Sequence, residues 1–153
     1  MQKELIEKKL NIDPAQLNAY SVGLLQGRAY RVLNTHLNKA LYEFDLSIPE
    51  WKLIGLLCEH GPMRLAEIAE RLSVEAPLVT NLIDNLEKKS LVERKNDKSD
   101  RRAKIISPTK KGNSMIPVID KKVKYVMAQL LSGAERVEMM NYMKVLQLIV
   151  NNS

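Results

Sequence analysis

The sequence predicts a mainly α-helical fold with one small β-hairpin. Apolar residues recur at spacings of three and four along most of the chain, which is the periodicity of helices that bury one face. The exception lies at residues 91–107, where two short apolar stretches flank a charged segment and indicate a hairpin. With 153 residues, the chain fits one domain that can bury a core.

The first long helix is predicted from Pro14 to about Phe44, after a short amphipathic segment at 1–13. Asp13 is expected to cap it, and Pro14 suits the first helical position. Two apolar stripes run along this helix, formed by Val22, Leu25, Ala29, Val32, His36 and Ala40 and by Leu33, Leu37, Leu41 and Phe44. One neighbouring helix cannot cover so wide a face, so we expect contacts on two sides.

Three shorter helices follow in the prediction. Ser47–Glu50 has the spacing of a capping box and begins the first of them, which Gly61 ends. The other two are predicted over Leu65–Leu72 and Ala76–Lys89, with a short turn between them. This pair has the layout of a helix-turn-helix.

Two strands and two more helices complete the chain. Leu91–Lys95 and Lys104–Ser107 are predicted as the strands of a two-stranded hairpin, with its tip at 96–102. Thr109 is expected to cap a long helix, and Ser132–Glu135 to begin the last helix through a second capping box. Three helices followed by a hairpin make a winged helix-turn-helix, in which the helix before the hairpin can enter the major groove of DNA.

We therefore predict two parts within the chain. Residues 47–108 form the winged helix-turn-helix. Residues 1–46 and 109–153 carry more apolar surface than so small a unit can cover. An extra core layer within a monomer is one explanation of that surface, and a homodimer that buries it between two copies is the one we favour.

The strongest charge feature is the run from Arg94 to Lys111. It holds eight basic and two acidic residues, and the resulting excess equals the net charge of the whole chain, +6. A positive excess held in one loop is suited to phosphate, although a solvated loop has a similar composition. Because this run falls on the hairpin beside the predicted recognition helix, we favour contact with phosphate.

The outward positions of the helix from Ala76 to Lys89 are the candidates for reading DNA. These positions are Ala76, Pro77, Leu78, Thr80, Asn81, Asp84 and Asn85. Asn81 can pair with adenine, the methyl group of Thr80 can touch that of thymine, and Asn85 can reach phosphate. Two lysines against three carboxylates leave residues 74–89 with a net charge of −1, which opposes DNA binding.

Four segments resemble the MarR (multiple-antibiotic-resistance regulator) family. They are Leu65-Ala-Glu-Ile-Ala-Glu-Arg-Leu72, residues 82–94, Asp100-Arg-Arg-Ala-Lys104 and Pro108-Thr-Lys-Lys-Gly112. The resemblance spans roughly residues 20–150. It implies a dimeric winged-helix transcription regulator, usually a repressor, whose N- and C-terminal helices pack as an all-helical dimerisation lobe. Many members respond to small phenolic ligands or to oxidants.

The resemblance also implies roles in the wing, which is the hairpin with its tip. Asp100 matches a carboxylate that orients an arginine, here Arg102, into the minor groove, and Arg101 matches a second basic position. The complete predicted wing set is Lys98, Ser99, Asp100, Arg101, Arg102 and Lys104. The chain departs from the family at Asn81, where arginine is most frequent, and at Leu78, where a small polar residue is common. Ser90 replaces the usual glycine and is expected to strain the cap if its backbone is left-handed.

A small aromatic or anionic effector is a further possible partner. The family's pockets lie near the joint between the first two helices, and the candidates there are Arg28, Arg31, His36 and Trp51. Packing and solvation explain these residues more simply, and His36 is expected to be a core histidine. Cys58 is expected to be a buried apolar residue rather than a redox sensor.

Other classes of function lack support in the sequence. A single cysteine excludes an internal disulfide, and the two histidines lack metal-ligand spacing. We find no set of acid, base and nucleophile and no phosphate-binding glycine loop, so we predict no enzyme and no cofactor. No apolar run is long enough to cross a bilayer and the N-terminus has no signal-type core, so a cytoplasmic location is expected.

The sequence thus predicts a homodimeric transcription regulator that binds a pseudo-palindromic double-stranded DNA. The alternative is a winged-helix module that binds another protein and no DNA.

Overall fold

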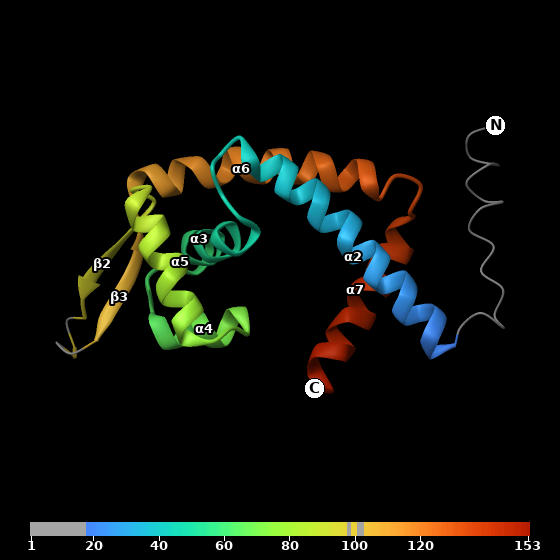
Figure 1. The fold of residues 1–153 in the computed structure, drawn as a ribbon, viewed down its shortest axis with the longest axis horizontal. Coiled ribbons are helices and arrows are strands. Elements are labelled where there is room, and N and C mark those ends of the chain that lie inside the picture. Colours follow the sequence, from blue (N-terminus) through green and yellow to red (C-terminus); the bar gives the residue numbers. More distant parts are fainter. Residues whose placement is uncertain (1–17, 98, 101–102) are drawn as a thin grey trace. The chain divides into compact units, whose positions relative to one another are not determined.

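The computed structural model describes residues 18–97, 99–100 and 103–153. Its elements are α2 (Ala19–Tyr42), α3 (Ile48–His60), β1 (Met63–Arg64), α4 (Leu65–Leu72), α5 (Ala76–Lys88), β2 (Val92–Asn96), β3 (Lys104–Pro108), α6 (Lys110–Leu130) and α7 (Arg136–Asn151) (Figure 1). One unit comprises residues 32–126, and the described residues 18–31 and 127–153 belong to a second unit. The amphipathic segment predicted at 1–13 lies outside the described residues.

The core of the first unit lies between α3, α4, α5 and the sheet. Each of these elements contributes fully buried aliphatic side chains, which are Leu53, Ile54, Leu57, Ile68, Val79, Ile83, Leu86 and Ile106. The three antiparallel strands are ordered β1-β3-β2, with Met63 opposite Ile106 and Val92 opposite Pro108. The prediction of a two-stranded hairpin was therefore incomplete, because β1 has two residues and is too short to produce a periodic signal.

Capping side chains explain where the helices begin. The Ser47–Glu50 box is confirmed, with the amide of Ser47 donating to Oε2 of Glu50 at 2.8 Å. The predicted start of the first long helix at Pro14 is wrong: α2 begins at Ala19, because Oδ1 of Asn18 accepts the amide of Ser21 at 2.9 Å. The last capping box also lies later than predicted, since Glu135 is the N-cap and its amide donates to Glu138 at 2.7 Å.

Ser90 occupies the left-handed region between α5 and β2. Its φ is 60°, so the condition under which strain was expected at this non-glycine residue, a left-handed backbone, is met. The amides of Ser90 and Leu91 donate to the carbonyls of Glu87 and Leu86 at 2.8 and 2.9 Å, the pattern of a Schellman cap. This cap ends α5 and turns the chain into the hairpin.

The start of α6 is bonded to this same turn. The hydroxyl of Thr109 donates to the carbonyl of Ser90 at 2.8 Å and accepts the amide of Gly112 at 3.1 Å, so Thr109 is the predicted cap. Lys111 Nζ donates to the carbonyl of Lys89 at 2.8 Å. A Cβ atom on Gly112 would lie 2.3 Å from the carbonyl oxygen of Leu91, so only glycine fits at this contact. We call this set of contacts the α5–α6 junction.

The second unit leaves much apolar surface exposed. No residue of α7, all of which the structure describes, is buried. Met140, Met143 and Val150 are 62–66% exposed. On the part of α2 that lies in this unit, Val22, Leu25 and Ala29 of the predicted apolar stripe are exposed in a single copy. Among the described residues, no helix combines the length and the apolarity needed to span a membrane.

Candidate nucleic-acid interface

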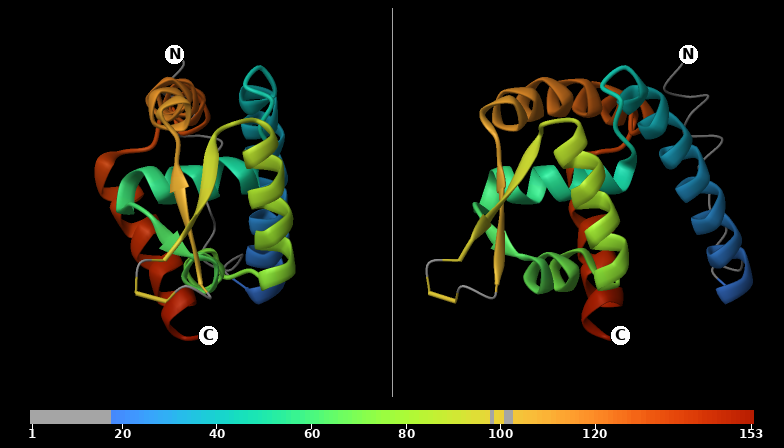
Figure 2. Two further views of the ribbon diagram at one scale, coloured as in Figure 1. Left: turned by 90° about the vertical axis from the view of Figure 1, so that its left-hand side faces the viewer. Right: turned by 60° about the vertical axis from the view of Figure 1, so that its left-hand side comes forward.

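The first unit combines a helix-turn-helix with a wing. The helices α4 and α5 are joined by a turn in which Ser73 is left-handed, and the strands β2 and β3 follow α5. Figures 1 and 2 show the first turns of α5 and the distal ends of β2 and β3 at the end of the unit that lies away from α6. A recognition helix and a hairpin that project at one end define a winged helix-turn-helix protein.

The outward residues of α5 are accessible. Ala76, Pro77, Leu78, Asn81 and Asn85 are exposed. The side-chain amide of Asn81 makes no hydrogen bond with the residues that the structure describes. Both its NH₂ donor and its carbonyl acceptor can therefore reach a base edge. Thr80 is half-buried, and its hydroxyl donates to the carbonyl of Ala76 at 3.1 Å, which leaves mainly its methyl group for a partner.

Arg94 does not belong to the free positive charge of the wing. Its guanidinium forms ion pairs with Asp84 and Glu87 of α5, and its amide donates to Oε1 of Glu87 at 2.9 Å. The side chain is 28% exposed. The prediction that all eight basic residues of this run contribute to a phosphate footprint is corrected here. The same contacts place one positive charge against two of the three carboxylates that opposed DNA binding by α5, and so offset part of their negative charge.

The described part of the wing contains a buried carboxylate that sequence reasoning missed. Asp97 accepts hydrogen bonds from Arg64, and from the amide and the hydroxyl of Ser99 at 2.8 Å each. Ser99, predicted to bind DNA, therefore has a structural role in the wing. Asp100 and Lys104 are exposed, and Lys104 Nζ donates to Oδ1 of Asn96 at 2.5 Å. The other predicted wing residues, Lys98, Arg101 and Arg102, lie outside the described residues.

The C-terminal end of α5 is fixed by an ion pair between the half-buried Lys89 and the buried Glu50. Lys89 Nζ lies 3.0 Å from Oε1 of Glu50 in α3 and donates to the carbonyl of Asp45 at 2.5 Å. Burial by itself raises the pKa of Glu50. Hydrogen bonds from the amide of Ser47, from Lys89 and from the Ser47 hydroxyl, with the charge of Lys89, outweigh it, so the pKa lies below its usual value. The ionised pair thus holds the recognition helix against α3.

Glu50→Gln is expected to lower the free energy of unfolding at neutral pH by about 1–3 kcal/mol, because Lys89 loses the nearer of its two anionic partners, the other being Asp45 at 3.8 Å. The folded-state pKa is lowered, so this contribution is present above the unfolded pKa of about 4.3 and disappears as the pH falls through the lower folded value. Urea unfolding of both proteins between pH 3 and 7 measures the difference. Glu59→Gln, at a carboxylate on the same helix that is 76% exposed, is the control. A difference that stays constant across this range would contradict the assignment.

A groove of about 750 Å³ lies between α3 and α6 in the first unit. It is lined by Trp51, Cys58 and Asp120 among others, and Trp51 Nε1 donates to Oδ1 of Asp120 at 3.3 Å. Cys58 is half-buried rather than buried as expected. Burial, followed by the charge of Asp120, raises the pKa of its thiol, which favours the unreactive protonated form.

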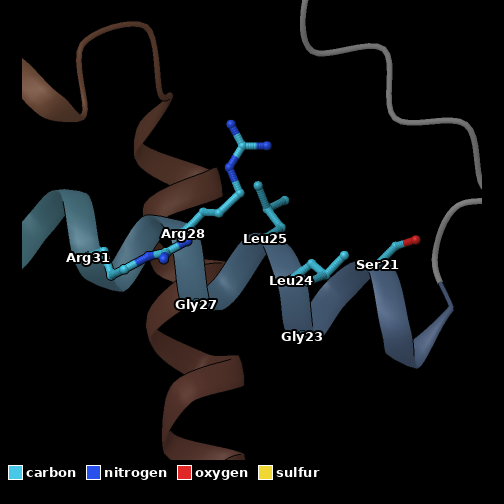
Figure 3. Close-up of a pocket in the computed structure, with 7 residues that line it drawn as sticks. All are labelled: Ser21, Gly23, Leu24, Leu25, Gly27, Arg28 and Arg31. Carbon is cyan, nitrogen blue, oxygen red and sulfur yellow. The ribbon is translucent and has the colours of Figure 1, made fainter.

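The other effector candidates are on α2. Arg28 and Arg31 line a shallow hollow of about 570 Å³, in which Gly23 and Gly27 expose bare backbone (Figure 3). Figure 3 shows Leu25 and Arg28 extending to the same side of this helix. His36 lines neither cavity. It is exposed and its Nδ1 lies 2.9 Å from the carbonyl of Val32, so the expectation of a core histidine is wrong. Among the described residues, no cluster of His, Cys, Asp and Glu is suited to hold a metal ion.

Comparison with known proteins relates this winged helix-turn-helix to one family. Residues 46–104 match the model of the MarR family, so this winged helix-turn-helix is similar to those of MarR-family regulators. Members of this family regulate transcription and are not enzymes.

Two curated relatives are from Bacillus subtilis (strain 168). The HTH-type transcriptional regulator MhqR is 31% identical over 93 residues, which cover 61% of this chain and 64% of MhqR. The HTH-type transcriptional repressor MdtR is 34% identical over 88 residues, which cover 58% of this chain and 57% of MdtR. The matched part therefore spans less than two thirds of either relative.

The fold is similar to that of CouR from Rhodococcus jostii RHA1, solved in complex with p-coumaroyl-CoA. The TM-score is 0.77 at 26% identity, and the match covers 84% of this chain and 90% of CouR. The likeness therefore extends beyond the segment that the family model matches and includes residues of both units.

Proposed function

We propose that this protein is a transcription regulator that binds a pseudo-palindromic double-stranded DNA as a homodimer and acts as a repressor. The observation that carries the proposal is the exposed face of α5, with Asn81 uncovered, beside a wing of basic composition. The likeness to MhqR and MdtR supports regulation, and the name of MdtR supports repression. The DNA that such a protein reads lies in the cytoplasm, which we propose as its location.

We propose two classes of DNA contact. The exposed residues of α5 face base edges in the major groove, with Asn81 as the principal reader. The basic wing residues Lys98, Arg101 and Lys104 face phosphate, and Arg102 enters the minor groove, as the family resemblance implies. The Arg94 ion pairs support this arrangement because they offset part of the negative charge of Asp84 and Glu87 beside the reading face.

The homodimer is proposed from the uncovered apolar surface of the second unit. Soluble monomers rarely expose contiguous apolar patches of more than a few hundred Å². On α7, Met140, Met143 and Val150 are exposed, and on α2 an added Cβ at Gly23 or Gly27 would meet no atom within 4 Å. We propose that residues 1–46 and 109–153 cover these faces between two copies, while residues 47–108 bind DNA.

A small aromatic or anionic effector is proposed to release the DNA. The α3–α6 groove, with the Trp51 ring in its lining, is the site that suits an aromatic group. The complex of CouR with p-coumaroyl-CoA supports a ligand of this class. Arg28 and Arg31 line the separate hollow on α2, which we propose as a second candidate site, for an anionic ligand.

A mobility-shift titration with the DNA upstream of the protein's own gene tests the proposal. A discrete complex that random DNA does not displace is expected. If neither DNA forms a complex while a protein partner binds α5 and the wing, the module is a protein-interaction domain instead.

Asn81→Ala is expected to relax the preference at one base pair in each half-site and to weaken operator binding by about 1–3 kcal/mol. The Lys104→Ala variant is the matched comparison, because a phosphate contact acts on every sequence. It should weaken operator and random DNA equally and reduce the slope of log affinity against log salt by about one. Fluorescence anisotropy on both DNAs over a KCl series separates the two roles. Equal losses on operator and random DNA for Asn81→Ala would contradict base reading.

A further inference from the structure

One arginine outside the wing and α5 links the wing to the helix-turn-helix. Arg64, the residue before α4, donates from Nε to Oδ2 of Asp97 at 2.8 Å. Its Nη2 bonds the same oxygen and reaches Oγ of Ser99 at 3.4 Å. Arg64 also pairs with Ile105 in the sheet, so its backbone belongs to the base of the wing.

Asp97 is the residue on which these bonds converge. Its Oδ1 accepts the amide and the hydroxyl of Ser99, and its own amide donates to the carbonyl of Ala103 at 3.1 Å. The Asp97 side chain is 7% exposed, while that of Arg64 is 51% exposed. A carboxylate so enclosed requires partners for its charge, and Ser99 and Arg64 supply them. The Ser99 amide and hydroxyl, followed by Arg64, hold the pKa of Asp97 well below its usual range, so the carboxylate stays ionised at neutral pH.

The three residues connect the start of the helix-turn-helix with the segment that follows β2. Arg64 is fixed by β1 and by the first turn of α4, whereas Asp97 and Ser99 follow the end of β2. The ion pair therefore spans from the helix-turn-helix to the distal half of the hairpin. Removing it leaves the base of the hairpin attached through the β1–β3 pairing and the Arg94 ion pairs with α5, but takes away the bond that holds the segment after β2.

We propose that Arg64 is a positioning residue for the wing. Through Asp97 it fixes the direction in which the tip leaves the sheet, and so delivers the basic residues of the tip beside α5. A wing whose direction is already fixed loses less conformational freedom on binding, which preserves affinity. The claim that the tip contacts DNA rests on the proposed function, whereas the fixed direction of the wing can be tested in the protein without DNA.

The test uses Arg64→Gln, Asp97→Asn and the double variant, with Arg71→Gln as a control. Arg71 lies on α4, the helix that follows Arg64. It pairs with Glu67 at 3.2 Å and carries the same charge as Arg64. Amide hydrogen exchange at Ser99 and Ala103 in the DNA-free protein is expected to accelerate roughly tenfold in each single variant, with no further gain in the double variant. Arg71→Gln leaves it unchanged.

On DNA, the same single variants are expected to bind the operator roughly tenfold more weakly. Hydroxyl-radical footprints should lose the protection of the wing in the flanking minor groove and keep that of α5 in the major groove. Arg64→Lys, which restores the charge but cannot form the forked contact, should recover part of both signals. If one of these variants unfolds, amide hydrogen exchange is measured instead in Ser99→Ala, which removes one hydroxyl and keeps the charges of Arg64 and Asp97.

Two results overturn the proposal. The first is unchanged exchange at Ser99 in Arg64→Gln. The second is that Arg64→Gln weakens DNA binding as much in the Asp97→Asn background as in the parent protein, and reduces the slope of log affinity against log salt by about one. That result would make Arg64 a direct phosphate ligand. A parent protein that binds no DNA refutes the proposed function, and the exchange data then still decide whether Arg64 fixes the wing.

Discussion

Gly112→Ala is expected to lower the free energy of unfolding by about 3 kcal/mol or more, at the upper end of the range for overpacked sites. An added Cβ would lie 2.3 Å from the carbonyl oxygen of Leu91 and 3.0 Å from Cδ1 of Ile54. The oxygen cannot move away easily, because it accepts the amide of Thr109 at 3.0 Å. For a chain of this size, thermal unfolding should show a melting temperature lower by roughly 6–12 °C.

Gly55→Ala is the matched control, because Gly55 lies within α3 and an added Cβ there would meet no atom within 4 Å. Alanine is the better helix former, so this change is expected to be neutral or to stabilise by up to about 1 kcal/mol. Equal destabilisation by the two variants would show that the contact with Leu91 is not the cause.

Removing residues 132–153 is expected to abolish dimerisation and to weaken operator binding by about 10²–10⁴-fold, the range by which linked binding of two half-sites exceeds single-site binding. The deletion removes α7, none of whose residues is buried in a single copy. Interfaces of obligate dimers typically bury about 2,000 Å² or more, and the apolar face of α7 is suited to supply part of that area. Sedimentation velocity and anisotropy measure the two losses.

Two point variants separate the interface from general damage to α7. Met143→Lys places a charge on a side chain that is 62% exposed and should weaken dimerisation, while Lys144→Ala on the same helix should not. Far-UV circular dichroism confirms that both remain helical. A parent protein that sediments as a 17.4 kDa species and still binds a palindromic DNA would refute the dimer.

Local signals in the sequence predicted most of the fold. The Ser47–Glu50 box, the extent of α4 and the cap at Thr109 each depend on residues within a few positions of one another, and each is confirmed. The first helix was predicted to start too early because Asp13 and Pro14 form an equally good local signal. Nothing in the sequence shows that Asn18 is the better cap for this helix.

The candidate site depends on contacts between distant residues, and these could not be predicted. In the sequence, Asp97 is one of the two acidic residues in the basic run from Arg94 to Lys111. Its partner Arg64 lies 33 positions earlier in the chain, so no local pattern indicates the ion pair. The sequence likewise predicts that Arg94 is one of the cations that face phosphate, whereas its guanidinium forms ion pairs with two carboxylates of α5. Composition gives the sign and the number of the charges, but only the packing of the elements determines which of them are neutralised.

The α5–α6 junction constrains how the recognition helix can respond to a ligand. Because Lys89, Ser90 and Leu91 are bonded to Thr109 and Lys111, the C-terminal end of α5 acts as a pivot and the helix cannot slide along its axis. Its 13 residues make a lever of about 20 Å. A rotation of about 10° at the pivot then displaces the far end, near Ala76 and Pro77, by about 3.5 Å, which exceeds the length of a hydrogen bond. A small tilt of α6 is thus magnified most at the first turns of α5, the part that would read the bases.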